Sequence, residues 1–196
     1  MIVEIICYAL SGFFMKISDE LLDESNHLYL AIITGLLCVF FTLAISTTNG
    51  DATCIFISIL IGTALAKKVD SINHIISAIV FVLLLVLINI PYFSWYALIL
   101  CTIAAIIDEK GNDISDELEL NGKSSERSFF YKFFKYRYSL KLAVFLLSIL
   151  GLLKMLYGGM LSGFDFFSPY TIIYFYAFDL AYETAGVLFE RFNYLL

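Results

Sequence analysis

The sequence contains few charged residues and very little proline. Lys, Arg, Asp and Glu make up 15% of its 196 residues, compared with about 25% in ordinary soluble domains. There are only two prolines, whereas hydrophobic residues make up 61% of the chain. This composition excludes a soluble globular domain and is typical of a multi-pass protein of the cell membrane.

Other absences exclude further classes of protein. Residues 2–15 have no basic residues before them and no small-residue cleavage site after them, so the sequence predicts no signal peptide. The four cysteines, Cys7, Cys38, Cys54 and Cys101, lie inside apolar segments without metal-ligand or redox spacing, and we interpret them as packing residues. A net charge of −6 excludes a basic nucleic-acid-binding protein.

Apolar stretches that approach the roughly 20 residues of a transmembrane helix follow one another along the chain. The expected spans are 2–17, 28–47, 53–67, 74–90, 92–107, 139–157 and 169–189. Pro91 separates the fourth span from the fifth, because proline interrupts a continuing helix. The sequence therefore predicts an all-α, polytopic integral membrane bundle of about seven transmembrane helices, formed by residues 1–196 as a single domain. Six spans are the alternative, if 92–107 is re-entrant.

Basic residues fall almost entirely on one side of these spans. Eleven of the twelve Lys and Arg residues lie on the side that the first span reaches, and only Lys154 lies on the other. Because Lys and Arg mark the cytoplasmic side, the N-terminus is expected outside and the C-terminus in the cytoplasm. Residues 108–138 then form a cytoplasmic loop. Within it, the alternating cations and aromatics of 127–141 predict an amphipathic segment that lies against membrane lipids.

Acidic residues gather on the same side, which the rule for basic residues does not explain. Four short motifs hold most of them: KISDELLDE, AKKVDSINH, IDEKGND and FDLAYE. The candidate side chains in and near these motifs are Lys16, Asp19, Asp23, Lys67, Lys68, Asp70, His74, Asp108, Asp113, Arg137, Lys141, Asp179 and Glu183. The alternation of sides predicts that the four motifs converge at the cytoplasmic face.

Each motif also has a structural interpretation. KISDELLDE is consistent with a solvated helix end held by a Lys16–Glu20 ion pair, and EKGND with a turn at Gly111. A structural interpretation is hardest to give for Asp179 and Glu183. Insertion of a carboxylate in the middle of a transmembrane helix costs at least about 2.5–3.5 kcal/mol. Two like charges one turn apart also repel unless a cation or a proton relieves them.

Three functions fit these residues. The first is a membrane enzyme that acts at the cytoplasmic face on a lipid phosphate or prenyl diphosphate, with a divalent cation, Mg²⁺, as cofactor. Asp179, Glu183 and Asp23 would be catalytic, and Lys16 and His74 would assist. The metal ligands would be Asp19, Asp23, Asp70, Asp108, Asp113 and Asp179, and the phosphate would be held by Lys67, Lys68, Arg137 and Lys141.

The second function is a small cation- or proton-coupled transporter or channel that uses Asp179 and Glu183, and the third is a non-catalytic membrane subunit or scaffold. Transport predicts polar residues that continue towards the outer side. DELLDE and DEKGND lack the N-D-x-x-D-x-x-x-D pattern of membrane prenyltransferases, and H-E-x-x-H is absent. We therefore assign no family from the sequence.

Overall fold

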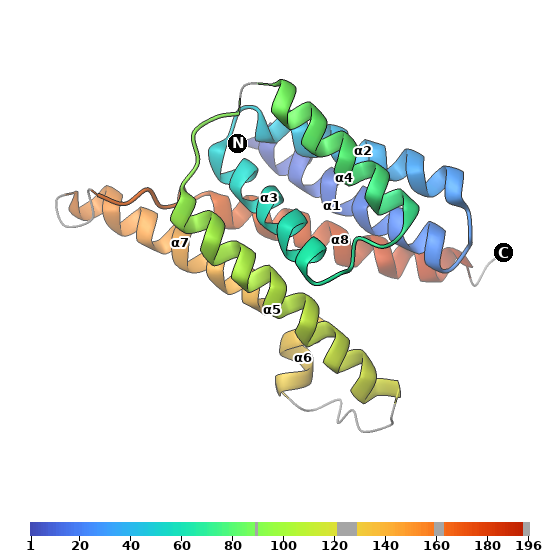
Figure 1. The fold of residues 1–196 in the computed structure, drawn as a ribbon. Helices are drawn as coiled ribbons and strands as arrows, with labels where there is room; N and C mark the ends of the chain where they lie inside the picture. Colours follow the sequence, from blue (N-terminus) through green and yellow to red (C-terminus); the bar gives the residue numbers. More distant parts are fainter. Residues whose placement is uncertain (89, 121–128, 159–162, 194–196) are drawn as a thin grey trace. The chain divides into compact units, whose positions relative to one another are not determined.

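The computed structural model describes residues 1–88, 90–120, 129–158 and 163–193, without the side chains of 119–120 and 192–193, and is all-helical there (Figure 1). Its helices are α1 (Ile2–Asp23), α2 (Leu28–Ser46), α3 (Gly50–Leu65), α4 (Ile72–Leu87), α5 (Trp95–Leu120), α6 (Phe129–Lys135), α7 (Tyr138–Tyr157) and α8 (Thr171–Asn193). The prediction of an all-α fold is confirmed, and each expected span contains one of these helices.

The turns lie where the sequence places helix-breaking residues. Between α2 and α3 the side-chain oxygen of Asn49 accepts hydrogen bonds from the backbone N–H groups of Asp51 (2.9 Å) and Ala52 (3.4 Å), which caps the start of α3. Helix α4 ends at Leu87, shortly before Pro91.

Helix α5 is longer than the sequence predicts. It continues through 108–120, where a loop and a turn at Gly111 are expected. Gly111 lies instead inside the helix, its Cα against the ring of Phe134, and its carbonyl accepts a hydrogen bond from Ser115 Oγ at 3.1 Å. The glycine therefore permits close helix packing and does not end the helix. Of the remainder of the predicted loop, 121–128 lies outside the described residues and includes the start of the 127–141 segment, and Phe129–Lys135 is helix α6.

Among the described residues, three helices are long and apolar enough to cross a membrane. These are α2, α7 and residues 171–191 of α8. Helices α3 and α4 are apolar but shorter, with 16 residues each. The count of seven spans remains a prediction.

The chain forms two compact units, and each is described by itself. Unit 1 comprises Met1–Thr53, Val69–Tyr92 and Ile173–Leu196, and unit 2 comprises Cys54–Lys68 and Phe93–Ile172. Each unit combines segments that are distant in sequence. This division into two compact units does not test the prediction that residues 1–196 form a single domain.

Unit 1 contains α1, α2, α4 and most of α8. Helices α1 and α2 form an antiparallel pair, because Ser18 bonds to Ala31 and Ser11 bonds to Thr42. Helix α8 runs parallel to α1: the Tyr8 and Tyr174 rings are 5.9 Å apart, and Gly12 lies against the Phe178 carbonyl. These directions agree with the predicted alternation of sides.

Unit 2 contains most of α3, together with α5, α6 and α7. Along the α3–α5 contact, Ser58 Oγ donates to the carbonyl of Leu98 at 3.2 Å, and a Cβ on Gly62 would lie 2.5 Å from that of Ala105. Small residues therefore let these two helices approach closely, as in membrane helix packing.

Replacement of Gly12 by alanine should destabilise the protein. A methyl group at this position would meet the Phe178 carbonyl and force α1 and α8 apart, at a cost of about 1–3 kcal/mol. Gly163→Ala is the control, because its added Cβ meets nothing within 4 Å. Thermal unfolding in detergent should show a lower midpoint for Gly12→Ala alone. An unchanged or raised midpoint, the usual effect of Gly→Ala in a helix, would contradict the close approach.

Candidate functional site

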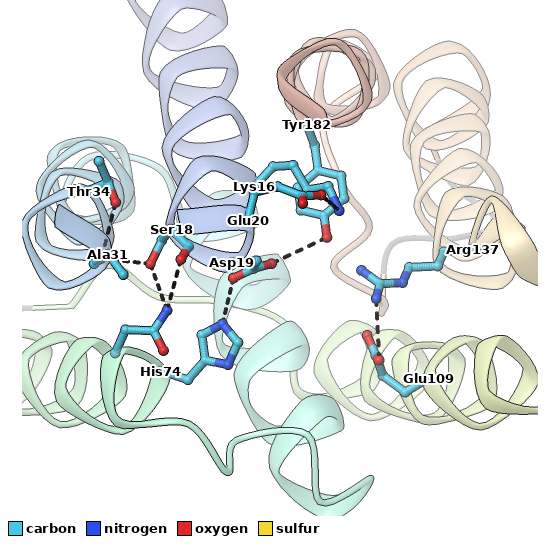
Figure 2. Close-up of polar contacts among 11 residues, drawn as sticks. Lys16, Ser18, Asp19, Glu20, Ala31, Thr34, His74, Glu109, Arg137 and Tyr182 are labelled. Carbon is cyan, nitrogen blue, oxygen red and sulfur yellow. Dashed lines mark hydrogen bonds and ion pairs between the residues drawn. The ribbon is translucent and has the colours of Figure 1, made fainter. Parts of the chain in front are cut away.

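A histidine–carboxylate pair lies at one end of unit 1 (Figure 2). His74 Nε2 on α4 is 2.6 Å from Asp19 Oδ1 on α1, although the residues are 55 positions apart in sequence. The Tyr182 hydroxyl on α8 lies 3.5 Å from Asp19 Oδ2. Three helices thus bring an imidazole, a carboxylate and a phenol together, and all three side chains are half-buried.

Lys16 lies beside this pair. Its Nζ is 2.6 Å from Glu20 Oε1 one turn along α1, which confirms the predicted ion pair. The ammonium is 5.4 Å from the centre of the Tyr182 ring, and a Cβ on Gly186 would lie 2.9 Å from the Lys16 stem. A cation over an aromatic ring is attracted by the negative face of the ring. Lys16 therefore connects α1 to α8, and its positive charge offsets the negative charge of Glu20.

Buried amide and hydroxyl groups hold the backbone on each side of the pair. Ser18 Oγ donates to the carbonyl of Ala31 at 2.8 Å, and Asn73 Nδ2 donates to Ser18 Oγ at 2.9 Å. Ser18 precedes Asp19, and Asn73 precedes His74. These hydrogen bonds fix the register of α1 against α4. We call Lys16, Ser18, Asp19, Glu20, Asn73, His74 and Tyr182 the His74 cluster.

The other candidates of unit 1 lie around this cluster. Asp23 is one turn beyond Asp19, where partial desolvation and then the negative charge of Asp19 raise the pKa of its carboxyl. Asp70 is exposed just before α4 begins. On α8, Asp179 is half-buried and Glu183 is exposed. Parts of the first, second and fourth motifs thus lie together in unit 1. The convergence of all four motifs at one face of the membrane remains a prediction.

In unit 2 the carboxylate of Asp108 caps another helix. Its two oxygens accept hydrogen bonds from the backbone N–H groups of Ser139 (2.8 Å) and Leu140 (2.7 Å), in the first turn of α7. The α7 N-cap, Arg137, has a left-handed backbone (φ 50°) and makes no side-chain cap of its own. Burial raises the pKa of Asp108, and the two N–H groups and Arg137 act in the opposite direction.

The cations expected to hold phosphate mostly contact protein acceptors. Arg137 Nη2 is 3.5 Å from Glu109 Oε2, and Lys68 forms an ion pair with Asp113 (Figure 2 shows the Arg137 pair). The buried Lys141 donates to the carbonyl of Tyr136 at 2.7 Å and lies over the Tyr138 ring. Lys67 is exposed, with a left-handed backbone (φ 62°). The second and third motifs thus meet in unit 2.

Sequence reasoning missed three members of the His74 cluster. Tyr182, Ser18 and Asn73 each adjoin a residue that was singled out: Glu183, Asp19 and His74. The sequence signal that could have found them is that each is a polar residue next to a candidate. Which neighbour faces the cluster depends on the rotation of each helix, and charge patterning alone does not give that rotation.

Asp108→Ala should destabilise the protein because it removes both acceptors at the start of α7. Loss of a helix N-cap costs about 0.5–2 kcal/mol. Asp116→Ala is the matched control, since Asp116 is exposed on the same helix and changes of that kind stay within about 0.5 kcal/mol. Chemical or thermal unfolding in detergent measures both. Equal stability of the two variants would refute the capping role.

Comparison with protein-family models, with curated proteins and with solved structures found no match. Among the described residues, no group of three or more His, Cys, Asp or Glu side chains is placed to hold a metal ion. The chemistry that the side chains themselves offer is proton exchange between an imidazole and a carboxylate, next to a phenol and a balanced Lys–Glu pair.

Proposed function

We propose that this chain is a multi-pass protein of the cell membrane that transports protons, alone or coupled to another solute. Support for a membrane location comes from α2, α7 and α8 and from the large apolar side chains that the helices expose. On α4, for example, Val86 is 76% exposed and Leu87 73%. Soluble monomers rarely expose contiguous apolar surface of this kind.

The His74–Asp19 contact is the observation that carries this proposal. Histidine is the side chain whose charge changes most readily near neutral pH. Its Nε2 lies 2.6 Å from Asp19 Oδ1, within hydrogen-bond distance of a carboxylate. Asp19 faces it from α1, and Asp23 interacts with it from the next turn of that helix. Lys16 pairs with Glu20 on the same helix, and Tyr182 of α8 contacts Asp19. A histidine–aspartate pair among membrane helices binds and releases one proton at a fixed place.

The cations of unit 2 favour this proposal over phosphate binding. Arg137, Lys68 and Lys141 each have an acceptor from the protein. A phosphate would have to replace those acceptors, two of which are carboxylates. The His74–Asp19 pair needs no such rearrangement to exchange a proton.

Proton flux into sealed vesicles tests the proposal. The purified protein is placed in liposomes that contain a pH-sensitive dye, and a potassium diffusion potential drives proton entry. His74→Gln and Asp19→Asn should each slow dye acidification by roughly tenfold or more, because each removes one proton-exchanging partner. His27→Gln should leave it unchanged, since His27 is the only other histidine in the sequence and is exposed. Equal flux in empty liposomes and in vesicles with the protein would refute transport.

A second candidate is the cytoplasmic-face enzyme that acts on a lipid phosphate or prenyl diphosphate with Mg²⁺. The crowding of Asp19, Glu20 and Asp23 on one helix end favours it. Partial desolvation and then the neighbouring carboxylates raise the pKa of Asp23, and a bound cation would relieve the repulsion between these carboxylates. Asp23, Asp179 and Glu183 remain its proposed catalytic groups.

Thermal unfolding with Mg²⁺ and a prenyl diphosphate tests the second candidate. A ligand at about 100 times its dissociation constant adds roughly 2.7 kcal/mol of stability. On this candidate, metal and diphosphate together should stabilise the protein more than the sum of each alone. Asp23→Asn should remove the excess and Asp116→Asn should keep it. Purely additive shifts would contradict an Mg²⁺–diphosphate site.

A further inference from the structure

Exposed tyrosine and tryptophan side chains lie at the ends of the two long helices of unit 2. Trp95 is 63% exposed, and Tyr96 is exposed beside it at the start of α5. Tyr157, the last residue of α7, is 74% exposed, and Tyr138, the first, is also exposed. Tryptophan and tyrosine are enriched where a membrane meets water, because each combines an apolar ring with a polar N–H or O–H group.

Two contacts place the start of α5 at the same end of unit 2 as the end of α7. The ring centres of Tyr96 and Phe164 are 5.7 Å apart. Phe164 is joined in turn to α7, because its carbonyl accepts a hydrogen bond from Lys154 Nζ at 2.5 Å, one turn before Tyr157. Trp95, Tyr96 and Tyr157 therefore share one end of the unit, and we call these three residues the Trp95 group.

Tyr138 lies one membrane thickness away from this group. Helix α7 has 20 residues from Tyr138 to Tyr157, which gives it a length of about 30 Å. The hydrocarbon core of a bilayer is also about 30 Å thick. At the Tyr138 end, Asp108 of α5 accepts hydrogen bonds from the N–H groups of Ser139 and Leu140, so the charged part of α5 begins level with Tyr138.

The surface between the two ends is apolar. Every exposed side chain of α7 between its two terminal tyrosines belongs to Leu, Ile, Phe or Met. The lysines of α7, Lys141 and Lys154, donate instead to backbone carbonyls. Between Tyr96 and Lys110, the exposed side chains of α5 are Ile99, Leu100, Ile103 and Ile107.

We propose that the Trp95 group binds the headgroup region of phospholipids, with the indole N–H of Trp95 and the hydroxyls of Tyr96 and Tyr157 donating to phosphate and ester oxygens. The proposal rests on the membrane location in the proposed function and adds the depth at which unit 2 lies. A phospholipid fits better than a protein partner, because polar-tipped rings followed by aliphatic side chains match a headgroup followed by acyl chains. Asp108 then lies at the opposite boundary of the membrane.

The fluorescence of Trp95 tests the proposal without any substitution, because Trp95 is the only tryptophan in the sequence. The unaltered protein is placed in phosphatidylcholine liposomes whose acyl chains carry bromine, a short-range quencher, either just below the headgroup or near the chain ends. Compared with unbrominated liposomes, bromine just below the headgroup should cause the greater loss of fluorescence. No loss with either lipid, or a greater loss with bromine near the chain ends, would overturn the proposal.

Two variants in a Trp95→Phe background are the matched controls. Leu146→Trp places the single tryptophan near the middle of α7, where Leu146 is exposed. Its fluorescence should fall most with bromine near the chain ends. Tyr157→Trp should reproduce the pattern of Trp95. Thermal unfolding of both variants checks that they fold, and the measurement on the unaltered protein stands without them.

The controls separate this proposal from the function on which it rests. If Leu146→Trp is quenched by the deep bromine and Trp95 is not quenched by the shallow one, the headgroup contact is wrong and the membrane location stands. If neither lipid quenches Leu146→Trp or Trp95, unit 2 lies outside the bilayer, and the membrane location fails together with the headgroup contact. Proton flux is measured separately and tests transport alone.

Discussion

The cost of a charge without a partner is the constraint on which this structure depends. In a chain that is 61% hydrophobic, a charged group in an apolar environment must find an opposite charge or a hydrogen-bond partner. The described charges follow this rule in pairs: Lys16 with Glu20, His74 with Asp19, Arg137 with Glu109. Two of these pairs, His74 with Asp19 and Arg137 with Glu109, join different segments of the chain.

Pairing also separates structural from chemically active carboxylates. Asp108 is buried, but both of its oxygens accept backbone N–H groups of α7, which fixes them in one arrangement. Asp19 differs because its partner is the imidazole of His74, a type of side chain that can exchange a proton near neutral pH. Two acidic residues that look alike in sequence therefore have different chemistry, because their partners differ.

Much of the fold follows from the sequence. Apolar runs gave the positions of the helices, Asn49 and Pro91 lie in the turns, and the Lys16–Glu20 pair follows from its spacing within one helix. Contacts between distant segments do not follow from it. The His74–Asp19 contact spans 55 residues, and the capping of α7 by Asp108 spans 31 and 32.

The sequence also does not predict which face of α8 packs against α1. Charge patterning favoured Asp179 and Glu183, but the close approaches at Gly12 and Gly186 set the rotation of α8 and bring Tyr182 to Asp19. In α5, the local pattern EKGND is typical of a turn, and packing against Phe134 keeps it helical. In both places tertiary packing overrides a local preference.

The parallel contact between α1 and α8 has a consequence for biosynthesis. Helix α1 leaves the ribosome before α8, which begins at Thr171. The contacts of Gly12 and Lys16 with α8 can therefore form only after α8 has been made. At about 5–20 residues per second, α8 follows on the order of ten seconds later. During that interval the nascent chain holds Asp19 and His74 without the phenol of Tyr182. The His74 cluster is thus completed only after Tyr182 has been made, and a product truncated before Tyr182 lacks it.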